Sequence, residues 1–390
     1  MEKKKYLFKQ LVVDARTGLN PRKNFKLGHG NNYYITIKDI HDGEIVITDK
    51  TEHIDDDALK IIDKRSRLQA GDVLFSSIGR IGETAIIKEK PSNWNINESV
   101  FAFTVNKNLI TPEFFRWMFK APVYKNEILR ESTGSTFVSI KMNKLNEMQF
   151  DVPGLDDQVL IVNELETIDS AIKTCDKIYK NLNELIVSKF YELFGDVGIN
   201  TKGLPIKPLH EVADYWNGLT YSPDDIVDSD EGILVLRSSN IQDGELSFED
   251  NVYVKTDIKE RLFVKNNDIL MCSRNGSARL VGKVALIKDL QDATTFGAFM
   301  MIIRSKYYMY LKTYFELAAF RDQIATNTST INQITGGMMD SVNVPTPNIN
   351  DVNVFETYVN EINSLKKNIK KRISSLQELL NSKIDYYFGI

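Results

Sequence analysis

Two segments of this chain each carry one narrow stripe of apolar residues, spaced alternately four and three positions apart. The stripes run from Ile161 to Ile186 and from Phe355 to Leu380. A heptad pattern of this length is typical of a coiled coil, because so narrow an apolar face is most simply buried against another helix. The predicted seam residues are Leu165, Ile168, Ile172, Cys175, Tyr179, Leu182, Ile186, Val359, Ile362, Ile369, Ile373, Leu376 and Leu380.

The two striped segments are copies of one unit. Phe194-Gly195 closes the first and Phe388-Gly389 closes the second, 194 residues later. A tandem duplication predicts two globular regions of related fold, each followed by a long helix, in a pseudo-two-fold arrangement. The helices can pair with each other, most simply antiparallel, or each can pair with a helix of another chain. Lys366 alone interrupts the second stripe, and we expect its methylenes to lie on the seam with the charge outside.

The regions that precede the helices repeat a second set of landmarks. An Asp-Gly turn between apolar residues predicts a hairpin at 40–45 and again at 241–246. Strands, a helical stretch and a final short strand follow in the same order in both copies. The sequence therefore predicts an α+β fold with two globular domains and two long helices. The predicted domains are residues 1–155 and 196–352, and the predicted helices are residues 156–195 and 353–390.

The composition adds few constraints. The chain has 390 residues, a net charge of −4 and two cysteines in different predicted elements, which suggests no disulfide framework. Its first residues lack the apolar core of a signal peptide, and no stretch approaches the roughly 18 apolar residues that a membrane span needs. We therefore expect a cytoplasmic protein. Neither half is strongly basic, so any attraction to nucleic acid has to come from individual loops.

Several short motifs recur in both copies or mark the junctions with the helices. They are Val12-Val13-Asp14 with Gly18-Leu19 and Pro21, Val212-Ala213-Asp214 with Gly218-Leu219 and Pro223, Gly71-Asp72-Val73-Leu74, Leu236-Arg237-Ser238-Ser239-Asn240-Ile241, and Phe150-Asp151-Val152-Pro153 with Asp157-Gln158. In this order the motifs resemble the specificity subunit of a type I restriction-modification system, over the whole length of the chain. The second junction, around Pro345, lacks the acidic residue and the glutamine of the first.

The resemblance implies a subunit that is not itself an enzyme and that binds double-stranded DNA. In this family two target-recognition domains each recognise one half of a bipartite, asymmetric site. Two helices form an antiparallel coiled coil that sets the spacing between the halves and docks two modification subunits. Those methyltransferase partners carry S-adenosylmethionine and methylate adenine, and motor-nuclease restriction subunits join them. The resemblance therefore implies that this chain itself holds no cofactor. The sequence also predicts no metal site, because no cysteine lies near the evenly spaced His29, His41 and His53.

Base recognition needs side chains that offer paired donors or acceptors, together with others that bind phosphate. In the second half, residues 271–288 contain four cations and no acid, and the loop 273–277 combines Arg, which suits guanine, with Asn, which suits adenine. The matching loop of the first half and the polar turns that follow in both halves are further candidates. The candidate DNA-binding residues are Lys38, Ser76, Ser77, Arg80, Thr133, Ser135, Thr136, Arg237, Asn240, Ser273, Arg274, Asn275, Arg279, Thr328, Ser329, Thr330, Asn332 and Gln333.

Two other functions stay open at this point. Asp224, Asp257 and Lys259 fit the acid–acid–lysine pattern of a stand-alone nuclease, and a coiled-coil adaptor without a DNA role would also carry the heptad stripes. A P-loop at 276–284 is disfavoured, because five residues instead of four separate the glycines and a valine replaces the magnesium-binding Ser or Thr. The Asn-Pro-Pro-aromatic tetrad of an adenine methyltransferase is absent, so methylation chemistry has to come from partners.

Overall fold

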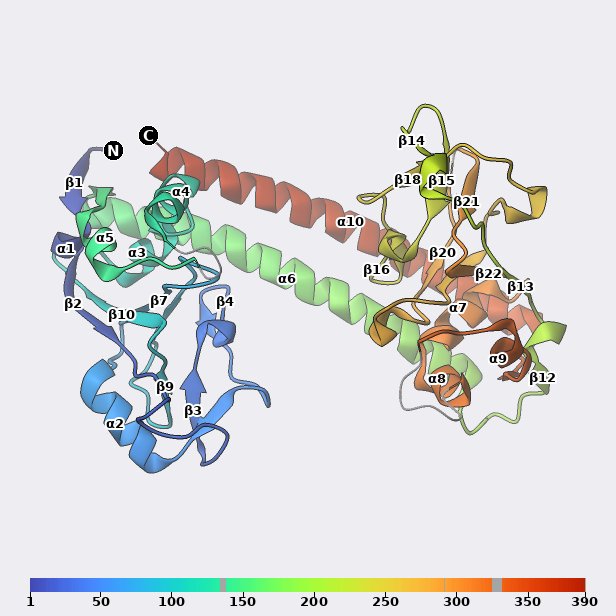
Figure 1. Cartoon of the computed structure of the whole chain (residues 1–390), viewed down its shortest axis with the longest axis horizontal. Coiled ribbons are helices and arrows are strands. Elements are labelled where there is room, and N and C mark those ends of the chain that lie inside the picture. The colour runs from blue at the N-terminus through green and yellow to red at the C-terminus, as the bar shows by residue number, and fades with distance from the viewer. Residues whose placement is uncertain (134–137, 291, 325–331, 390) are drawn as a thin grey trace. The chain divides into compact units, whose positions relative to one another are not determined.

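The computed structural model describes residues 1–133, 138–290, 292–324 and 332–389. The chain divides into two units, of which unit 1 comprises Met1–Asp176 with Lys371–Ile390 and unit 2 comprises Lys177–Lys370. The two long helices, α6 (Leu155–Phe194) and α10 (Ile349–Phe388), therefore each contribute one part to unit 1 and another part to unit 2 (Figure 1). Within the described ranges, no helix is both long and apolar enough to cross a membrane.

Unit 1 is built on an antiparallel sheet with the strand order β2-β10-β7-β8, beside a smaller sheet with the order β6-β3-β9 in which β3 and β9 are parallel. A two-stranded pair, β1-β11, and the short hairpin β4-β5 complete its strands. The strands are β1 (Lys3–Leu7), β2 (Val12–Thr17), β3 (Asn32–Ile35), β4 (Ile40–His41), β5 (Glu44–Ile45), β6 (Glu52–Ile54), β7 (Val73–Ser76), β8 (Thr84–Ile86), β9 (Trp94–Ile96), β10 (Val100–Val105) and β11 (Gln149–Pro153). The shorter helices are α1 (Phe8–Leu11), η1 (Ile37–Asp39), α2 (Asp56–Ser66), α3 (Pro112–Met118), α4 (Pro122–Glu131) and α5 (Met142–Glu147).

Unit 2 repeats most of this topology and adds strand β14 to the second sheet. Its sheets have the orders β13-β22-β19-β20 and β14-β18-β15-β21, with β15 and β21 parallel, and its two-stranded pairs are β12-β23 and β16-β17. The strands are β12 (Ile206–Pro208), β13 (Asp214–Asn217), β14 (Ile226–Val227), β15 (Ile233–Leu236), β16 (Ile241–Gln242), β17 (Glu245–Leu246), β18 (Val252–Val254), β19 (Ile269–Cys272), β20 (Val284–Leu286), β21 (Thr294–Phe296), β22 (Met300–Arg304) and β23 (Asn343–Pro345). The shorter helices are η2 (Leu209–Glu211), η3 (Pro223–Asp225), η4 (Ser238–Asn240), η5 (Glu260–Leu262), η6 (Ala278–Leu280), α7 (Tyr308–Glu316), α8 (Ala318–Ile324) and α9 (Gly336–Asp340). The predicted mixture of α and β elements is confirmed.

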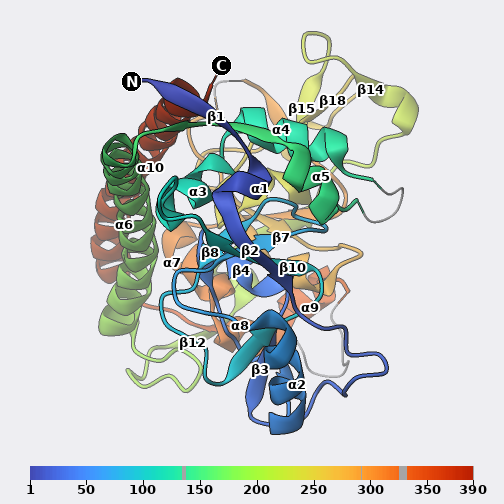
Figure 2. The ribbon, with the colours of Figure 1, turned by 90° about the vertical axis from the view of Figure 1, so that its left-hand side faces the viewer.

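Helix α2 of unit 1 is an element that the sequence analysis missed. Its signals are local: Asp55 accepts a hydrogen bond from the Ala58 backbone at 2.8 Å as the N-cap, and Arg67 ends the helix in the left-handed conformation with φ of 44°. Acidic residues in the first turn and basic residues in the last complement the helix dipole. Ala58 and Ile62 are buried against Tyr34 of β3, beside which the helix lies (Figure 2).

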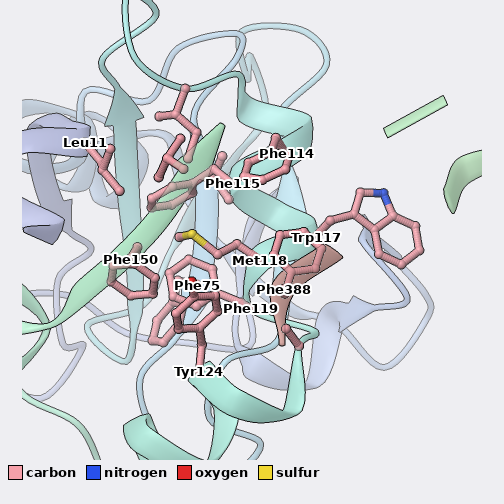
Figure 3. Packing of buried hydrophobic residues seen from close by; sticks show 14 of the residues in the cluster. Leu11, Phe75, Phe114, Phe115, Trp117, Met118, Phe119, Tyr124, Phe150 and Phe388 are labelled. Atoms are coloured by element: carbon pink, nitrogen blue, oxygen red, sulfur yellow. The ribbon is translucent and has the colours of Figure 1, made fainter. Parts of the chain in front are cut away.

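The repeated Phe-Gly endings close the cores of the two units. In unit 1, Phe388 lies among the aromatic side chains of the core, with its ring centroid 5.1 Å from that of Phe114 (Figure 3). In unit 2, Phe194 is fully buried and its ring lies 4.9 Å from Tyr310. Gly195 then leaves the helix with φ of +69°, which explains the glycine. Each core is thus completed by the last turn of a long helix.

Within unit 1, the beginning of α6 packs against the end of α10 (Figure 1). Leu165 and Leu380 are buried in the same cluster, and Glu164 and Lys383 form an ion pair at 2.6 Å. In unit 2 the remaining parts of the helices meet in the same sense, because Phe190 near the end of α6 contacts Phe355 near the start of α10. All predicted seam residues are buried or half-buried, in agreement with the stripe.

Lys366 differs from the prediction. Its side chain is only 7% exposed, and its ammonium lies 3.0 Å from Glu245 of the hairpin β16-β17 and 5.0 Å from the ring centroid of Tyr179. Lys370 reaches the other oxygen of Glu245 at 2.5 Å. The charge is therefore not outside but buried, because a carboxylate and an aromatic face replace water around it. This Glu245 cluster ties the hairpin of unit 2 to both long helices.

Glu245→Gln tests this cluster. Burial alone would raise the pKa of Glu245, but the hydrogen bonds and charges of Lys370 and Lys366 hold it below the ordinary value. At neutral pH the variant should lose about 1.5–3 kcal/mol of unfolding free energy, because a buried lysine loses its charged partner. The difference from the wild-type chain should be complete above pH ~4.3 and shrink as the pH falls through the lowered pKa.

Denaturant unfolding of both chains between pH 7 and pH 3 measures this difference. Glu44→Gln is the matched control, because Glu44 occupies the same hairpin position in unit 1 but pairs with Lys88, whose side chain is 80% exposed. Exposed ion pairs contribute little. Equal losses for the two variants, or a difference that does not change with pH, would contradict the role given to the cluster.

Candidate nucleic-acid interface

Each unit has a cavity at the same place in its fold, where the parallel strand pair ends. In unit 2 this cavity measures about 1020 Å³ and lies between η4, the loop after β19 and the turn between β21 and β22. In unit 1 the corresponding cavity measures about 640 Å³ and lies between η1, the segment after β2 and the end of β9. We call them the unit 2 pocket and the unit 1 pocket.

Arg274 supplies the free charge of the unit 2 pocket. Its backbone is fixed, because its amide donates to the carbonyl of Phe299 at 3.0 Å and the residue forms a β-bridge with Gln333. The guanidinium lies over the ring of Phe299, 5.3 Å from the centroid, and no acidic partner is found among the described residues. Phe299 itself is 60% exposed. A cation and an aromatic face are therefore presented together to solvent.

Two other predicted residues of this pocket are occupied by structural bonds. Arg237 forms an ion pair with Asp250 at 3.0 Å. The Asn275 amide donates to Ser238 at 3.0 Å and its oxygen accepts from the Ser277 backbone at 2.9 Å, which shapes the loop. Arg274 is therefore the side chain of this pocket that remains most available to a ligand.

The unit 1 pocket has a different lining. Lys38 lies on its rim with Arg22 and Lys50, all three exposed and without an acidic partner in the described part of the chain. Tyr34 and Glu98 lie within it, and the Tyr34 hydroxyl donates to the Leu19 carbonyl at 2.7 Å. Burial, followed by the charge and hydrogen bond of Glu98, raises the pKa of Tyr34 far above its ordinary value. The hydroxyl therefore stays protonated as a donor.

Four of the predicted DNA-binding residues are buried, so DNA contact stays a prediction that their burial disfavours. Asn240 is 0% exposed, and its amide nitrogen donates to the Ser247 carbonyl at 2.9 Å while its oxygen accepts from the Arg237 backbone at 2.8 Å. Ser76, Ser77 and Ser273 are likewise buried in strand ends. Small polar side chains in a loop often form hydrogen bonds with the backbone of the same loop. Buried residues of this kind stabilise the loops that line the pockets.

The remaining predicted residues divide into two groups. Arg80 is exposed, but its guanidinium donates to the carbonyls of Ile37 and Ile40 at 2.8 and 3.0 Å and so holds η1 against its loop. Thr133, Arg279, Asn332 and Gln333 are exposed. Ser135, Thr136, Thr328, Ser329 and Thr330 lie outside the described residues.

Several residues of the unit 1 pocket were not predicted from the sequence. The missed residues are Asn20, Arg22, Tyr34, Lys50 and Glu98. One signal was available, because residues 15–38 contain Arg16, Arg22, Lys23, Lys26 and Lys38 and no acid. In unit 2, Phe299 carried no comparable signal, because a single phenylalanine after a strand is ordinarily a core residue.

The three residues of the nuclease alternative do not form a common site in the part of the chain that the structure describes. Asp224, Asp257 and Lys259 are exposed, on η3 and on the segment before η5. Over the ranges that the structure covers, no three His, Cys, Asp or Glu side chains are grouped so as to hold a metal ion.

Comparison with known proteins identifies a family match in the first half of the chain. Residues 10–184 match the family model of the type I restriction modification DNA specificity domain. This part of the chain belongs to that family. The predicted resemblance to type I specificity subunits is therefore confirmed, with the family match limited to residues 10–184.

Curated relatives agree with the specificity domain. The chain is 24% identical over 187 residues to the type I restriction enzyme StySPI specificity subunit of Salmonella potsdam, and 24% identical over 187 residues to the EcoKI specificity subunit of Escherichia coli K12. Each match covers 46% of this chain and 40% of the relative. The chain thus matches about two fifths of the length of these relatives.

Solved structures extend the similarity of fold to the whole chain. The S subunit of a type I restriction-modification system from M. genitalium covers 100% of this chain with a TM-score of 0.54 and 13% identity. A chain from a structural study of type I complex assembly and conformational transition covers 98% with a TM-score of 0.57 and 15% identity. Both halves of the chain therefore share a fold with these proteins.

Asn240→Ala separates a structural role from DNA contact. The substitution should lower the unfolding free energy by about 1–3 kcal/mol, because several backbone groups around η4 lose their buried partner. Denaturant unfolding measures this loss, and Glu249→Ala, at an exposed position nearby, should change it little. Unchanged stability of the Asn240 variant would return this residue to the list of possible DNA contacts.

Proposed function

We propose that this chain is the sequence-specific DNA-recognition subunit of a type I restriction-modification complex. Its two domains, over about residues 1–155 and 196–352, each recognise one half of a bipartite, asymmetric DNA target. The observation that carries this proposal is the pair of equivalent pockets: the same topology presents Arg274 and Phe299 in one unit and Tyr34, Lys38 and Glu98 in the other. Unlike linings on like frames suit two unlike half-sites.

Exposed cations around the pockets supply the attraction to DNA that the net charge of −4 does not. Arg22, Lys38 and Lys50 line the unit 1 pocket, and Arg274 lines the unit 2 pocket. Phosphate contacts of this kind position a protein on the duplex, whereas contacts to base edges specify the sequence. Binding should therefore weaken with salt, with a slope that a few phosphate contacts set.

The two long helices set the distance between the half-sites. We infer that α6 and α10 form one antiparallel coiled coil, because in each unit the apolar stripes face each other in opposite chain directions. Each helix has 40 residues and rises about 1.5 Å per residue, so the coiled coil keeps a defined length. The spacer in the DNA target then follows from the helices.

The outer faces of the helices dock two like partners. Three positions carry an exposed apolar residue in both copies of the repeat, at the constant offset of 194 residues. Matched exposure in two copies favours two identical partners, and we assign them as the modification subunits, which bring S-adenosylmethionine and methylate adenine. Restriction subunits with motor and nuclease activity join this core. The matched positions are Leu155 with Ile349, Leu160 with Val354, and Leu185 with Leu379.

Arg274→Ala tests the DNA-recognition role. Loss of a guanidinium that contacts a base edge should cost about 1–3 kcal/mol in binding and relax one position of one half-site. The chain is expressed with its modification subunits in a host without methylation, and long-read methylation mapping reports the motif. A motif that is not bipartite, or no motif at all, would contradict the proposed function. An unchanged motif would reassign Arg274 to phosphate or solvent.

Leu160→Asp combined with Val354→Asp tests the docking face. A charge at each matched apolar position should greatly reduce co-purification of the modification subunits, because burying an unpaired carboxylate is costly. Ile178→Asp is the control, since Ile178 is 41% exposed on α6 but its counterpart in the repeat is Arg372. Equal co-purification of all three proteins would contradict the assignment.

A further inference from the structure

The unit 1 pocket contains a carboxylate that is held in place without an ion pair. Glu98 accepts a hydrogen bond from the side-chain nitrogen of Asn20, and its second oxygen lies 3.3 Å from the Tyr34 hydroxyl. No lysine or arginine forms an ion pair with Glu98 in the part of the chain described. Because a carboxylate can accept about four hydrogen bonds, it keeps free acceptor capacity toward the pocket.

Asn20 adds a second acceptor to the same pocket. Its side-chain oxygen is buried and has no hydrogen-bond partner among the described residues. The orientation of the amide is determined, because rotating it would place this oxygen against the Glu98 carboxylate. A buried polar atom without a partner costs about 1–3 kcal/mol, so such an atom beside a cavity points to a ligand that completes its bond. That ligand has to donate hydrogen.

The unit 2 pocket has no carboxylate at the position that matches Glu98. The residue that corresponds to Glu98 is Ala298, since each lies two positions after the last residue of the paired strands β9 and β21. Instead, the unit 2 pocket carries the Arg274 guanidinium, a donor without an acidic partner among the residues described. The matching pockets thus differ in one pair of groups: unit 1 adds a carboxylate, which accepts hydrogen bonds, and unit 2 adds a guanidinium, which donates them.

Base edges in the major groove differ in the same way. Cytosine and adenine present an exocyclic amino group there, whereas guanine and thymine present a carbonyl oxygen. We propose that Glu98 and Asn20 make the unit 1 pocket specific for the exocyclic amino group of a cytosine or adenine, while the unit 2 pocket binds a base carbonyl through Arg274. This inference rests on the proposed function and deepens it.

A carboxylate close to DNA also has to be tolerated next to phosphate. Arg22, Lys38 and Lys50 line the same pocket, so cations surround Glu98 at the rim where the phosphates of a bound duplex would lie. A single base edge then meets the acceptors while the backbone meets the cations. In protein–DNA interfaces, contacts to phosphates and contacts to base edges are commonly made by different side chains.

The test compares Glu98→Gln with the wild-type chain, each in complex with its modification subunits. Glutamine keeps an oxygen for the Asn20 bond and adds a donor, so one position of one half-site should now accept a guanine or thymine on the same strand. Glu89→Gln, an exposed carboxylate of the same unit, should leave the motif unchanged. The half-site that Arg274→Ala relaxes should also stay unchanged in the Glu98 variant.

A binding measurement keeps the inference testable if the Glu98 variant does not fold. Each cytosine of the half-site is replaced by 2-pyrimidinone, and each adenine by purine, which removes the amino group alone. The wild-type complex should bind one of these analogue duplexes about 10-fold to 100-fold more weakly than the natural duplex, which a hydrogen bond to a charged group predicts. The affected analogue shows whether the amino group belongs to cytosine or to adenine.

The possible results distinguish a failure of the proposed function from a failure of the pocket assignment. A wild-type complex without a bipartite motif overturns the proposed function itself. A bipartite motif that Glu98→Gln leaves identical, or natural affinity for every analogue of the half-site, overturns only the assignment of the unit 1 pocket.

Discussion

The structure depends on two apolar stripes that neither long helix can bury alone. In each unit, parts of α6 and α10 face each other, and the last turn of one of them enters the core through Phe388 or Phe194. The two long helices therefore contribute side chains to the hydrophobic cores of both units. A phenylalanine occupies the matching last position of both helices, so the duplication repeats this core contact as well as the apolar stripe. Any change that separates the helices also opens the cores.

Polar interactions attach the globular parts to this apolar frame. In unit 2, Glu245 joins the hairpin to Lys366 and Lys370 next to Tyr179. In unit 1, the equivalent hairpin approaches α6 through the Asp42 carbonyl and the Lys173 ammonium, 3.5 Å apart. A buried polar contact on a helix seam favours one register over its neighbours, since a slip leaves a charge unpaired. The orientation of each pocket relative to the helix in its own unit follows from these contacts.

Both pockets lie where loops of divergent sequence leave strands of repeated topology. The strands, turns and buried serines and asparagines make the frame, and the residues that line the pockets differ between the two units. This explains why several loop residues chosen for their chemistry, such as Asn240 and Ser273, are buried, whereas Glu98 and Phe299 line the pockets although the sequence did not single them out. A polar residue in a loop motif has the same letter whether it bonds its own backbone or a ligand. Its burial distinguishes the two cases.

The sequence by itself determined the matched Phe-Gly endings, the mixture of helices and strands, the two heptad stripes and the resemblance to type I specificity subunits. These properties are local or periodic: a stripe, an Asp-Gly turn or a Phe-Gly ending keeps its meaning wherever the segment lies. Only the tertiary structure decided where the charge of Lys366 goes, which loop residues are buried, and that Asn20, Tyr34 and Glu98 share one cavity. In the sequence, Asn20 lies 14 positions before Tyr34, and Glu98 lies 64 positions after it. They meet because β3 pairs in parallel with β9, and a long-range pairing of strands has no signature in the sequence near either strand.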